Sequence, residues 1–384
     1  MTTNGLLWLL RILRIKVAAS SSTVKLASAM AESASAVVAA LAAKCAALTS
    51  QLDDSALDAQ LAAAAGNVAV AGAPPAAAVP KSWASGKEDA IGVALAIFVT
   101  AANDLERGSV KLALCCGDGS ATGAQAASLC DELVPAADAF ATAAQVLGGD
   151  GAGAGAPLRA LARGAARRLL EALRALAASL AAGDGSQNAK SGVVWEAAGA
   201  ARQLPASNRA AYRREFLSWA TELKDAIAEF GELAAAEAFS YDSIDDGFGG
   251  DDDAYGDAER PAAAAVVECL RVLGATYKDV LVAMDAAGKG GDFEFVASVY
   301  GAGAALRRSA TTLAEELYPP LDPATLGAAL DGAAGAMAAV LAVLDARAGL
   351  PPPPPDGPPT LRARWDAKRD AAAALVAALP PAEP

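Results

Sequence analysis

The five cysteines are the first residues whose chemistry can be judged from their spacing. They are Cys45, Cys115, Cys116, Cys130 and Cys269. They form no CxxC pair, they are odd in number, and they lie in apolar helical contexts, as is typical of reduced, buried thiols. A redox pair at Cys115–Cys116 is the alternative, although adjacent cysteines bridge only with strain. We expect the thiols to pack in a reducing compartment.

Other catalytic patterns are missing from the sequence. Histidine is absent, which removes the usual general base near neutral pH and the commonest metal ligand. Glu315 and Glu316 are adjacent and therefore point to different faces of a helix. There is no GxxxxGK[ST] loop or GxSxG elbow, and the glycine tract 148–155 follows a helix where a dinucleotide fingerprint needs a strand. We predict a non-enzyme with no catalytic, cofactor-binding or metal-ligating residues.

An acidic stretch separates the two halves of the chain. Eight acids lie between Asp242 and Glu259, and their self-repulsion and low apolar content oppose folding. Asp242, Asp245 and Asp246 miss the alternation of an EF-hand loop, which argues against calcium. Ser243, followed by Ile-Asp-Asp, has the acidic context of a candidate phosphorylation site, where phosphate deepens an existing negative patch.

Net charge and the amino terminus limit the partners. The formal charge is −13, which argues against nucleic acid. Residues Leu6–Val17 are apolar with interspersed Arg and Lys, a Ser-rich run follows, and no acid precedes Glu32. This pattern fits an organellar transit peptide, and a frayed helix or extension is the alternative. No apolar run there reaches about 20 residues, so we expect no integral membrane segment.

Helical periodicity recurs in nearly all the segments between the proline and glycine clusters that break helices. In these segments apolar residues are spaced three or four positions apart. The predicted stripes run over Met30–Leu48, Ile91–Leu105, Leu129–Leu147, Leu158–Leu180, Val194–Ala198, Tyr212–Phe230, Val266–Met284, Phe293–Leu317, Leu326–Leu344 and Leu361–Leu379. The spacing of the stripe Tyr212–Phe230 is close to the heptad-like spacing that antiparallel bundles use. We therefore predict an all-α protein of two up-and-down helical bundles joined by the acidic linker.

Changes in composition along the chain define the predicted segments. They are a basic amphipathic extension at 1–23, a five-helix bundle at 24–240, an acidic linker at 241–260, a second bundle at 261–348, a proline-rich segment at 349–359, and a short helix and tail at 360–384. Within the fifth segment, Pro351–Pro355 is a stiff spacer or a polyproline ligand for an SH3 or WW groove.

Three stretches in a fixed order carry a resemblance to a known family. The first runs from Ser128 to Phe140 and continues at Leu158 to Ala165, including Arg163 and Gly164. The second contains Val193-Val194-Trp195-Glu196-Ala197, Pro205, Asn208, Lys224 and Asp225. The third is Leu317-Tyr318-Pro319-Pro320. With the acid-rich segment between the second and the third, this order resembles the cyclin-D-interacting (cyclin-D-binding) protein family over residues 125–344.

The resemblance implies a fold and a function. It implies two helical bundles similar to the talin and vinculin modules, and a negative regulator of cell-cycle progression that binds D-type cyclin or helix-loop-helix transcription factors in the nucleus and cytoplasm. A talin-like cytoskeletal scaffold is the alternative from another class. Delivery to an organelle through the basic amino terminus is the third hypothesis.

The motif residues also have structural interpretations. Trp195 and Trp219 lie on apolar stripes, so we expect core packing, with anchoring of a partner as the alternative. We expect the motif Tyr318-Pro319-Pro320 to end a helix and form a corner, because proline removes a backbone donor and fixes φ. Docking is the alternative there. Ser207 and Asn208 are both plausible N-caps for the helix that follows Pro205.

Overall fold

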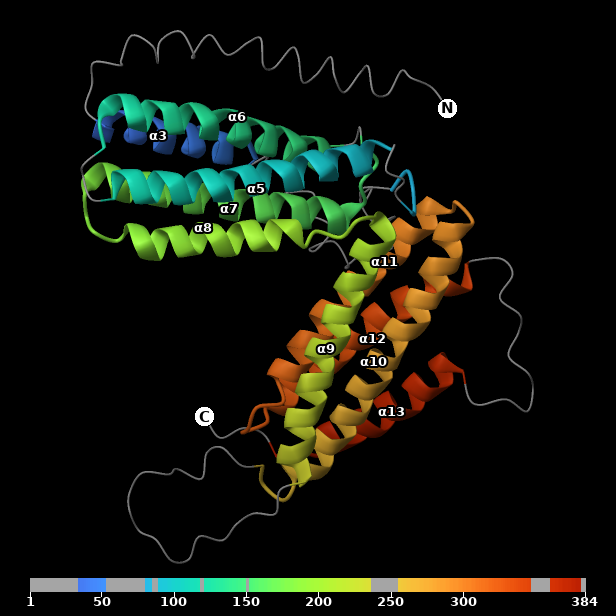
Figure 1. The fold of residues 1–384 in the computed structure, drawn as a ribbon. Coiled ribbons are helices and arrows are strands. Elements are labelled where there is room, and N and C mark those ends of the chain that lie inside the picture. The colour runs from blue at the N-terminus through green and yellow to red at the C-terminus, as the bar shows by residue number, and fades with distance from the viewer. Residues whose placement is uncertain are drawn as a thin grey trace, which may run out of the picture. The chain divides into compact units, whose positions relative to one another are not determined.

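The computed structural model describes residues 34–52, 80–84, 89–117, 121–149, 152–235, 255–346 and 360–380. These residues form ten α-helices, and no β-strand occurs among them (Figure 1). The predicted all-α fold of helical bundles is therefore confirmed.

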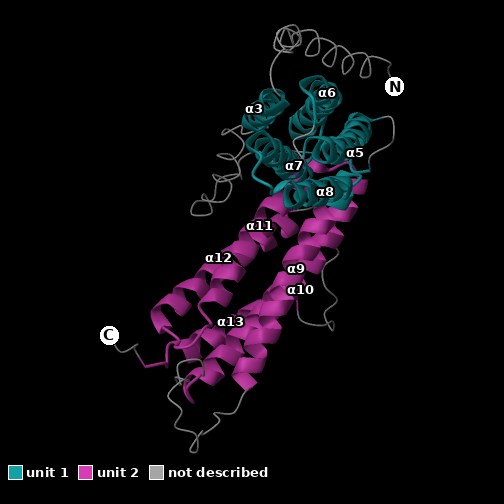
Figure 2. Cartoon of the chain, turned by 60° about the vertical axis from the view of Figure 1, so that its left-hand side comes forward, with its two compact units in different colours: residues 1–59, 78–211 teal, residues 60–77, 212–384 magenta. Residues whose placement is uncertain are grey.

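The chain divides into two compact units (Figure 2). Unit 1 contains residues 1–59 and 78–211, and unit 2 contains residues 60–77 and 212–384. The division falls in the first turn of α9 (Asn208–Ala235), whereas the sequence prediction divided the chain at the acidic stretch 241–260. The described residues on both sides of that stretch belong to unit 2. The difference arises because Phe216 and Trp219 of α9 pack on aromatic residues from later in the chain.

Unit 1 is a bundle of five described helices. They are α3 (Ala34–Leu52), α5 (Ala90–Cys116), α6 (Gly123–Gly148), α7 (Ala156–Ala182) and α8 (Gln187–Arg202). The helices pack in a closed ring in the order α3, α6, α5, α8, α7. Leucine and alanine fill most of the core, and the rings of Phe98 and Phe140 meet in it with their centroids 4.2 Å apart.

Local sequence signals set where α6 begins and how closely α5 approaches α6 in unit 1. Helix α6 begins with a capping box, in which Thr122 Oγ1 accepts from Gln125 N (3.3 Å) and Gln125 Oε1 accepts from Thr122 N (2.9 Å). A Cβ at Gly108 of α5 would lie 2.5 Å from Leu133 Cδ2 of α6. The missing side chain lets these two helices approach closely.

Unit 2 is also built from five described helices. They are α9, α10 (Glu259–Lys289), α11 (Phe293–Glu315), α12 (Pro323–Asp345) and α13 (Leu361–Val376). Helix α10 packs on α11 and α13, and α12 packs on α11 and α13. The sequence prediction separated α13 from the second bundle, but Trp365 of α13 is only 2% exposed. Burial of this large side chain joins the helix to the bundle.

An aromatic cluster fills the centre of unit 2 where α9, α10 and α11 meet. Trp219 stacks on Tyr300 with a centroid distance of 5.6 Å, and Phe216 lies 4.6 Å from Trp219 and 6.0 Å from Tyr277. A Cβ at Gly303 would lie 2.7 Å from the ring of Phe216. The cluster therefore depends on a glycine at that position.

Several predicted segments lie outside the described residues. These are the extension at 1–23, the proline-rich segment at 349–359 and most of the acidic stretch, including Ser243. Among the described helices, α3 and α12 are long and apolar enough to cross a membrane by length and composition. Each buries a stripe of apolar side chains in its own unit, and core helices meet the same criterion.

Candidate partner-binding surface

Asn208 is buried at one end of unit 1 and holds two loops together. Its Oδ1 accepts from Gly155 N (2.7 Å), and its Nδ2 donates to Ser82 O (2.7 Å) and Gly153 O (3.0 Å). The cap of α9 comes from Ser207, whose Oγ accepts from Ala210 N (3.2 Å). Of the two predicted N-cap residues, Ser207 caps the helix and Asn208 clamps the loops.

The segments around Asn208 reinforce this clamp. Arg159 is 5% exposed and its Nε donates to Ala154 O (2.7 Å). Lys81 N donates to Gly153 O (2.9 Å), and the φ of Gly153 is +74°, a left-handed conformation that favours glycine. Pro205 is buried. The Pro205 and Asn208 motif positions therefore shape this end of unit 1.

The remaining motif residues lie apart from one another. A Cβ at Gly148 would lie 3.0 Å from Arg163 Nε, and Gly164 O accepts from Arg168 Nε (3.2 Å). Lys224 and Asp225 are exposed on the part of α9 that belongs to unit 2. The structure does not gather the predicted motif residues into one site.

Tyr318 makes its contacts within unit 2. Its hydroxyl donates to Glu229 Oε1 (2.9 Å), and its ring meets the edge of Phe230 at a centroid distance of 4.9 Å. The peptide bond between Pro319 and Pro320 is cis. The side chain of Tyr318 is thus held in place although it is 53% exposed.

The two motif tryptophans lie in opposite environments. Trp219 is 4% exposed, which agrees with the expected core packing, whereas Trp195 is 62% exposed. The core interpretation is wrong for Trp195 because Val194, Ala197, Ala198 and Ala201 are the residues of α8 that face inward. Trp195 lies beside that stripe, on a flank of the helix.

The packing register of α5 and α8 places other exposed apolar residues near Trp195. Arg202 of α8 pairs with Glu106 of α5, and Gln187 Nε2 donates to Gly117 O (3.1 Å), so the two helices are antiparallel. Trp195 lies two helical turns before Arg202 and shares its flank. Val110 and Leu114 follow Glu106 by one and two turns and are rotated from it by about 40° and 80° toward the exposed face of α5.

These three residues form a strip that we call the α5–α8 patch. Its members Val110, Leu114 and Trp195 are 40%, 76% and 62% exposed. Sequence reasoning missed Val110 and Leu114. The signal that could have found them is their four-residue spacing off the buried stripe that contains Leu105 and Leu112.

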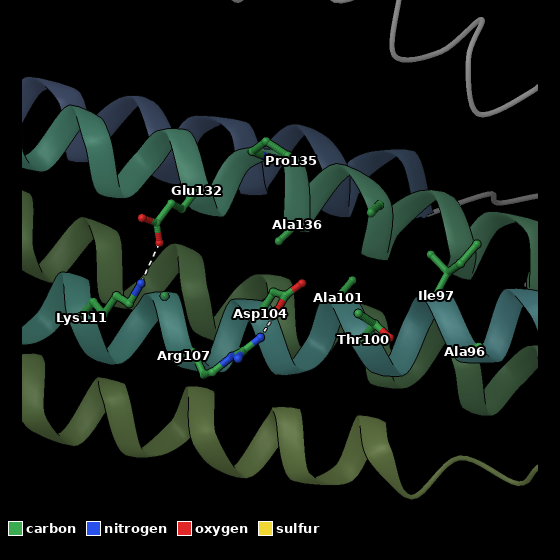
Figure 3. Close-up of a pocket in the computed structure, with 12 residues that line it drawn as sticks. Ala96, Ile97, Thr100, Ala101, Asp104, Arg107, Lys111, Glu132, Pro135 and Ala136 are labelled. Carbon is green, nitrogen blue, oxygen red and sulfur yellow. Dashed lines mark hydrogen bonds and ion pairs between the residues drawn. The ribbon is translucent and has the colours of Figure 1, made fainter. Parts of the chain in front are cut away.

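A groove lies along the other side of α5, against α6 (Figure 3). Its volume is about 750 Å³, and alanines form much of its wall together with Ile97 and Pro135. Lys111 Nζ of α5 pairs with Glu132 Oε2 of α6 (2.8 Å), and Arg107 pairs with Asp104 (Figure 3). Both pairs are solvent-exposed, so they add little stability and are available to charged groups of a partner.

The expected burial of the thiols is correct for Cys45, Cys130 and Cys269 but wrong for Cys115, which is exposed, and for Cys116, which is half-buried. Burial raises the pKa of Cys45, Cys130 and Cys269 to about 12, so these thiols stay protonated near neutral pH. Among the described residues, no group of three or more His, Cys, Asp or Glu side chains is arranged to hold a metal ion. Binding through the apolar surface of α5 and α8 is the chemistry that the described residues support best.

An all-α bundle with an exposed apolar patch and a neighbouring groove has surface features that helical protein-binding modules use. Residues 98–236 match the family Grap2 and cyclin-D-interacting, N-terminal. The predicted resemblance to this family is confirmed over these residues, and the stretch Leu317–Pro320 lies outside the match. The match includes the whole α5–α8 patch. A search of curated proteins finds no match to the chain.

Proposed function

We propose that this protein is a non-catalytic regulator that binds a D-type cyclin or a helix-loop-helix transcription factor through the α5–α8 patch. The family match over residues 98–236 supports the class of partner. The observation that carries the proposal is the 62% exposure of Trp195 inside the matched domain. Large aromatic side chains are the commonest anchors of protein interfaces.

The partner element in this proposal is an amphipathic helix. Helix α5 presents the groove on one side and the α5–α8 patch on the other, and Arg107 and Lys111 lie on its exposed surface. A helix of about five turns is long enough to follow α5 from the apolar part of the groove to Leu114. Its apolar face would cover Trp195, Val110 and Leu114, as helices do in hydrophobic grooves.

In this proposal the protein regulates its partner by sequestering it. A cyclin or helix-loop-helix protein held on this surface is withheld from its other interactions, which restrains cell-cycle progression. We place this binding in the cytoplasm and nucleus. The net charge of −13 supports a protein partner over nucleic acid. Fluorescence of the full-length protein tests the location, and accumulation in an organelle after loss of the amino terminus would contradict it.

Capture of purified D-type cyclin by the full-length protein tests the proposal directly. We expect Trp195→Ala to weaken capture at least tenfold, since loss of an interface anchor costs about 2 kcal/mol or more. Leu114→Glu should weaken it as well, because it buries a charge under the partner. Val193→Ala is the matched control, since Val193 is 51% exposed on the opposite flank of α8.

The outcomes separate the parts of the proposal. Capture of a helix-loop-helix protein in place of cyclin, with the same sensitivity to Trp195→Ala, selects that partner. Equal capture by the wild type and by Trp195→Ala removes the patch from the proposal. No capture of either partner, combined with cosedimentation with actin filaments, would favour the scaffold hypothesis.

A further inference from the structure

Two adjacent arginines of α11 have different electrostatic environments. Arg307 is paired with Glu222, whose Oε2 accepts from Arg307 Nε (2.9 Å) and Nη2 (2.8 Å). Arg308 makes no ion pair with any described residue, and its buried Nη2 has no hydrogen-bond partner among them. Burial, together with the charge of Arg307, lowers the pKa of Arg308. The guanidinium of Arg308 is therefore part-exposed and forms no ion pair with a described carboxylate.

A guanidinium with a buried donor and no ion pair is unusual in a folded protein. A buried donor without an acceptor destabilises the fold, and the cost is larger when the donor is charged. Proteins commonly keep such groups where a ligand completes them. The surroundings of Arg308 decide which ligand fits.

Arg308 lines a cavity of about 420 Å³ between α11 and α12. Ser309, Thr312 and Thr325 bring three hydroxyl groups to its wall, and Ala328, Ala329 and Gly332 supply small apolar surfaces. A Cβ added at Gly332 would meet no atom within 4 Å. The cavity therefore combines the guanidinium of Arg308, the hydroxyl groups of Ser309 and Thr312 and small apolar surfaces, while the Thr325 hydroxyl donates to Asp322 O (3.4 Å).

We propose that this cavity binds an organic carboxylate with an apolar body, held by the guanidinium of Arg308. Arg308 lines the cavity, and its Nη2 is a donor without an acceptor among the described residues. A guanidinium binds a carboxylate through two parallel hydrogen bonds. A single cation with Glu316 in the same wall suits a monoanion better than a doubly charged phosphate. This site is in unit 2 and does not depend on the proposed cyclin surface.

The carboxylate can come from a free small acid or from an acidic side chain of a peptide. Ligand-observed NMR with the full-length protein distinguishes these sources. The probes are hexanoate, the acetylated and amidated peptide Leu-Ala-Glu-Ala, and hexanol as the neutral analogue. Tighter binding of hexanoate selects a free acid, and tighter binding of the peptide selects an acidic partner segment. Binding of hexanol as strong as that of hexanoate overturns the role of the charge.

Two variants complete the test. We expect Arg308→Gln to weaken carboxylate binding at least tenfold and Arg307→Gln to leave it within twofold. Because Arg308→Gln removes a charge that no described carboxylate pairs with, we also expect an unchanged or higher Tm. Unchanged binding by Arg308→Gln, or no binding of either carboxylate to the wild type, overturns the proposal. A lower Tm with carboxylate binding retained would assign Arg308 a purely structural role.

Discussion

The two units use five described helices each, but they fill their interiors differently. Unit 1 is packed mainly with alanine and leucine, and the buried Asn208 makes three hydrogen bonds at one end of it. Unit 2 places Phe216, Trp219, Tyr277 and Tyr300 in one aromatic cluster. Small side chains leave unit 1 dependent on hydrogen bonds at its loops. Large rings make unit 2 dependent on close packing.

Tryptophan substitutions should separate the units most strongly. Trp219→Ala removes a side chain that is 4% exposed from the cluster, so we expect unit 2 to lose about 4 kcal/mol of stability. Trp195→Ala is the matched control in unit 1 and should change stability by less than about 0.5 kcal/mol. Hydrogen exchange read separately over the helices of each unit measures both effects. Similar losses in both variants would contradict the assignment of Trp195 to the surface.

Asn208→Ala tests the polar clamp of unit 1. The change leaves Gly155 N without its acceptor and removes the donor to two carbonyls. Each buried group left unpaired costs about 1–3 kcal/mol, so we expect a total loss of about 3 kcal/mol. Denaturant unfolding followed in unit 1 measures it, with Asn188→Ala at an exposed position of α8 as control. An equal, small effect of both variants would show that the clamp is dispensable.

Glycine substitutions compare the closeness of packing in the two interiors. At Gly303 a Cβ meets the rigid ring of Phe216 at 2.7 Å, whereas at Gly108 it meets the flexible end of Leu133 at 2.5 Å. We expect Gly303→Ala to cost about 2 kcal/mol through overpacking. Gly108→Ala should change stability by at most about 1 kcal/mol, because Leu133 can rotate away and alanine favours the helix. Thermal unfolding that ranks the two in the opposite order would refute this comparison.

The smallest expected difference is in the response to acid. Burial is the main cause that raises the pKa of Glu215 in unit 2 above its ordinary value of 4.5. Its favourable contribution is therefore fully present below pH 4.5 and is lost as pH rises through the raised pKa. In unit 1, hydrogen bonds from Ser179 and Ser186 lower the pKa of Asp184 from 3.8 to about 2. Its contribution is present above pH 3.8 and is lost as pH falls through about 2.

Hydrogen exchange across this pH range measures the contrast. After correction for the intrinsic pH dependence of amide exchange, acidification from neutral pH to 4.5 should raise the protection of unit 2, and Glu215→Gln should abolish that change. Acidification below 3.8 should lower the protection near Asp184, and Asp184→Asn should remove that dependence. A pH response of unit 2 that survives Glu215→Gln would assign it to other carboxyl groups.

The sequence predicted the helices well because their signals are local. Stripes such as Leu158–Leu180 require only the helical period, and they match the described helices. The division of the chain was less accessible, because the stripe of Phe216 and Trp219 does not reveal which other helices it contacts. The acidic stretch has a composition that opposes folding. A segment of this kind can connect two helices of one unit as well as two units, so it did not identify the boundary.

The candidate surface was only partly predictable for a similar reason. The family motif led to Trp195, but periodicity alone placed it in the core, since position beside a stripe and position within it differ by one residue. Glu222 pairs with Arg307 from a distant helix, whereas Arg308 pairs with no described carboxylate. Tertiary packing decides which charges pair in this way. The spacing of charges along the chain does not predict that packing.

The start of α9 has a practical consequence for dissecting the protein. Residues 208–211 of this helix belong to unit 1 and the following residues to unit 2, so no loop exists at which to separate them. A fragment cut to the family match 98–236 would lack α3 and all of α10 to α13. It would carry Phe216 and Trp219 uncovered into solvent. Poor solubility of such a fragment would therefore reflect where it was cut and would not count against the family's ability to bind partners.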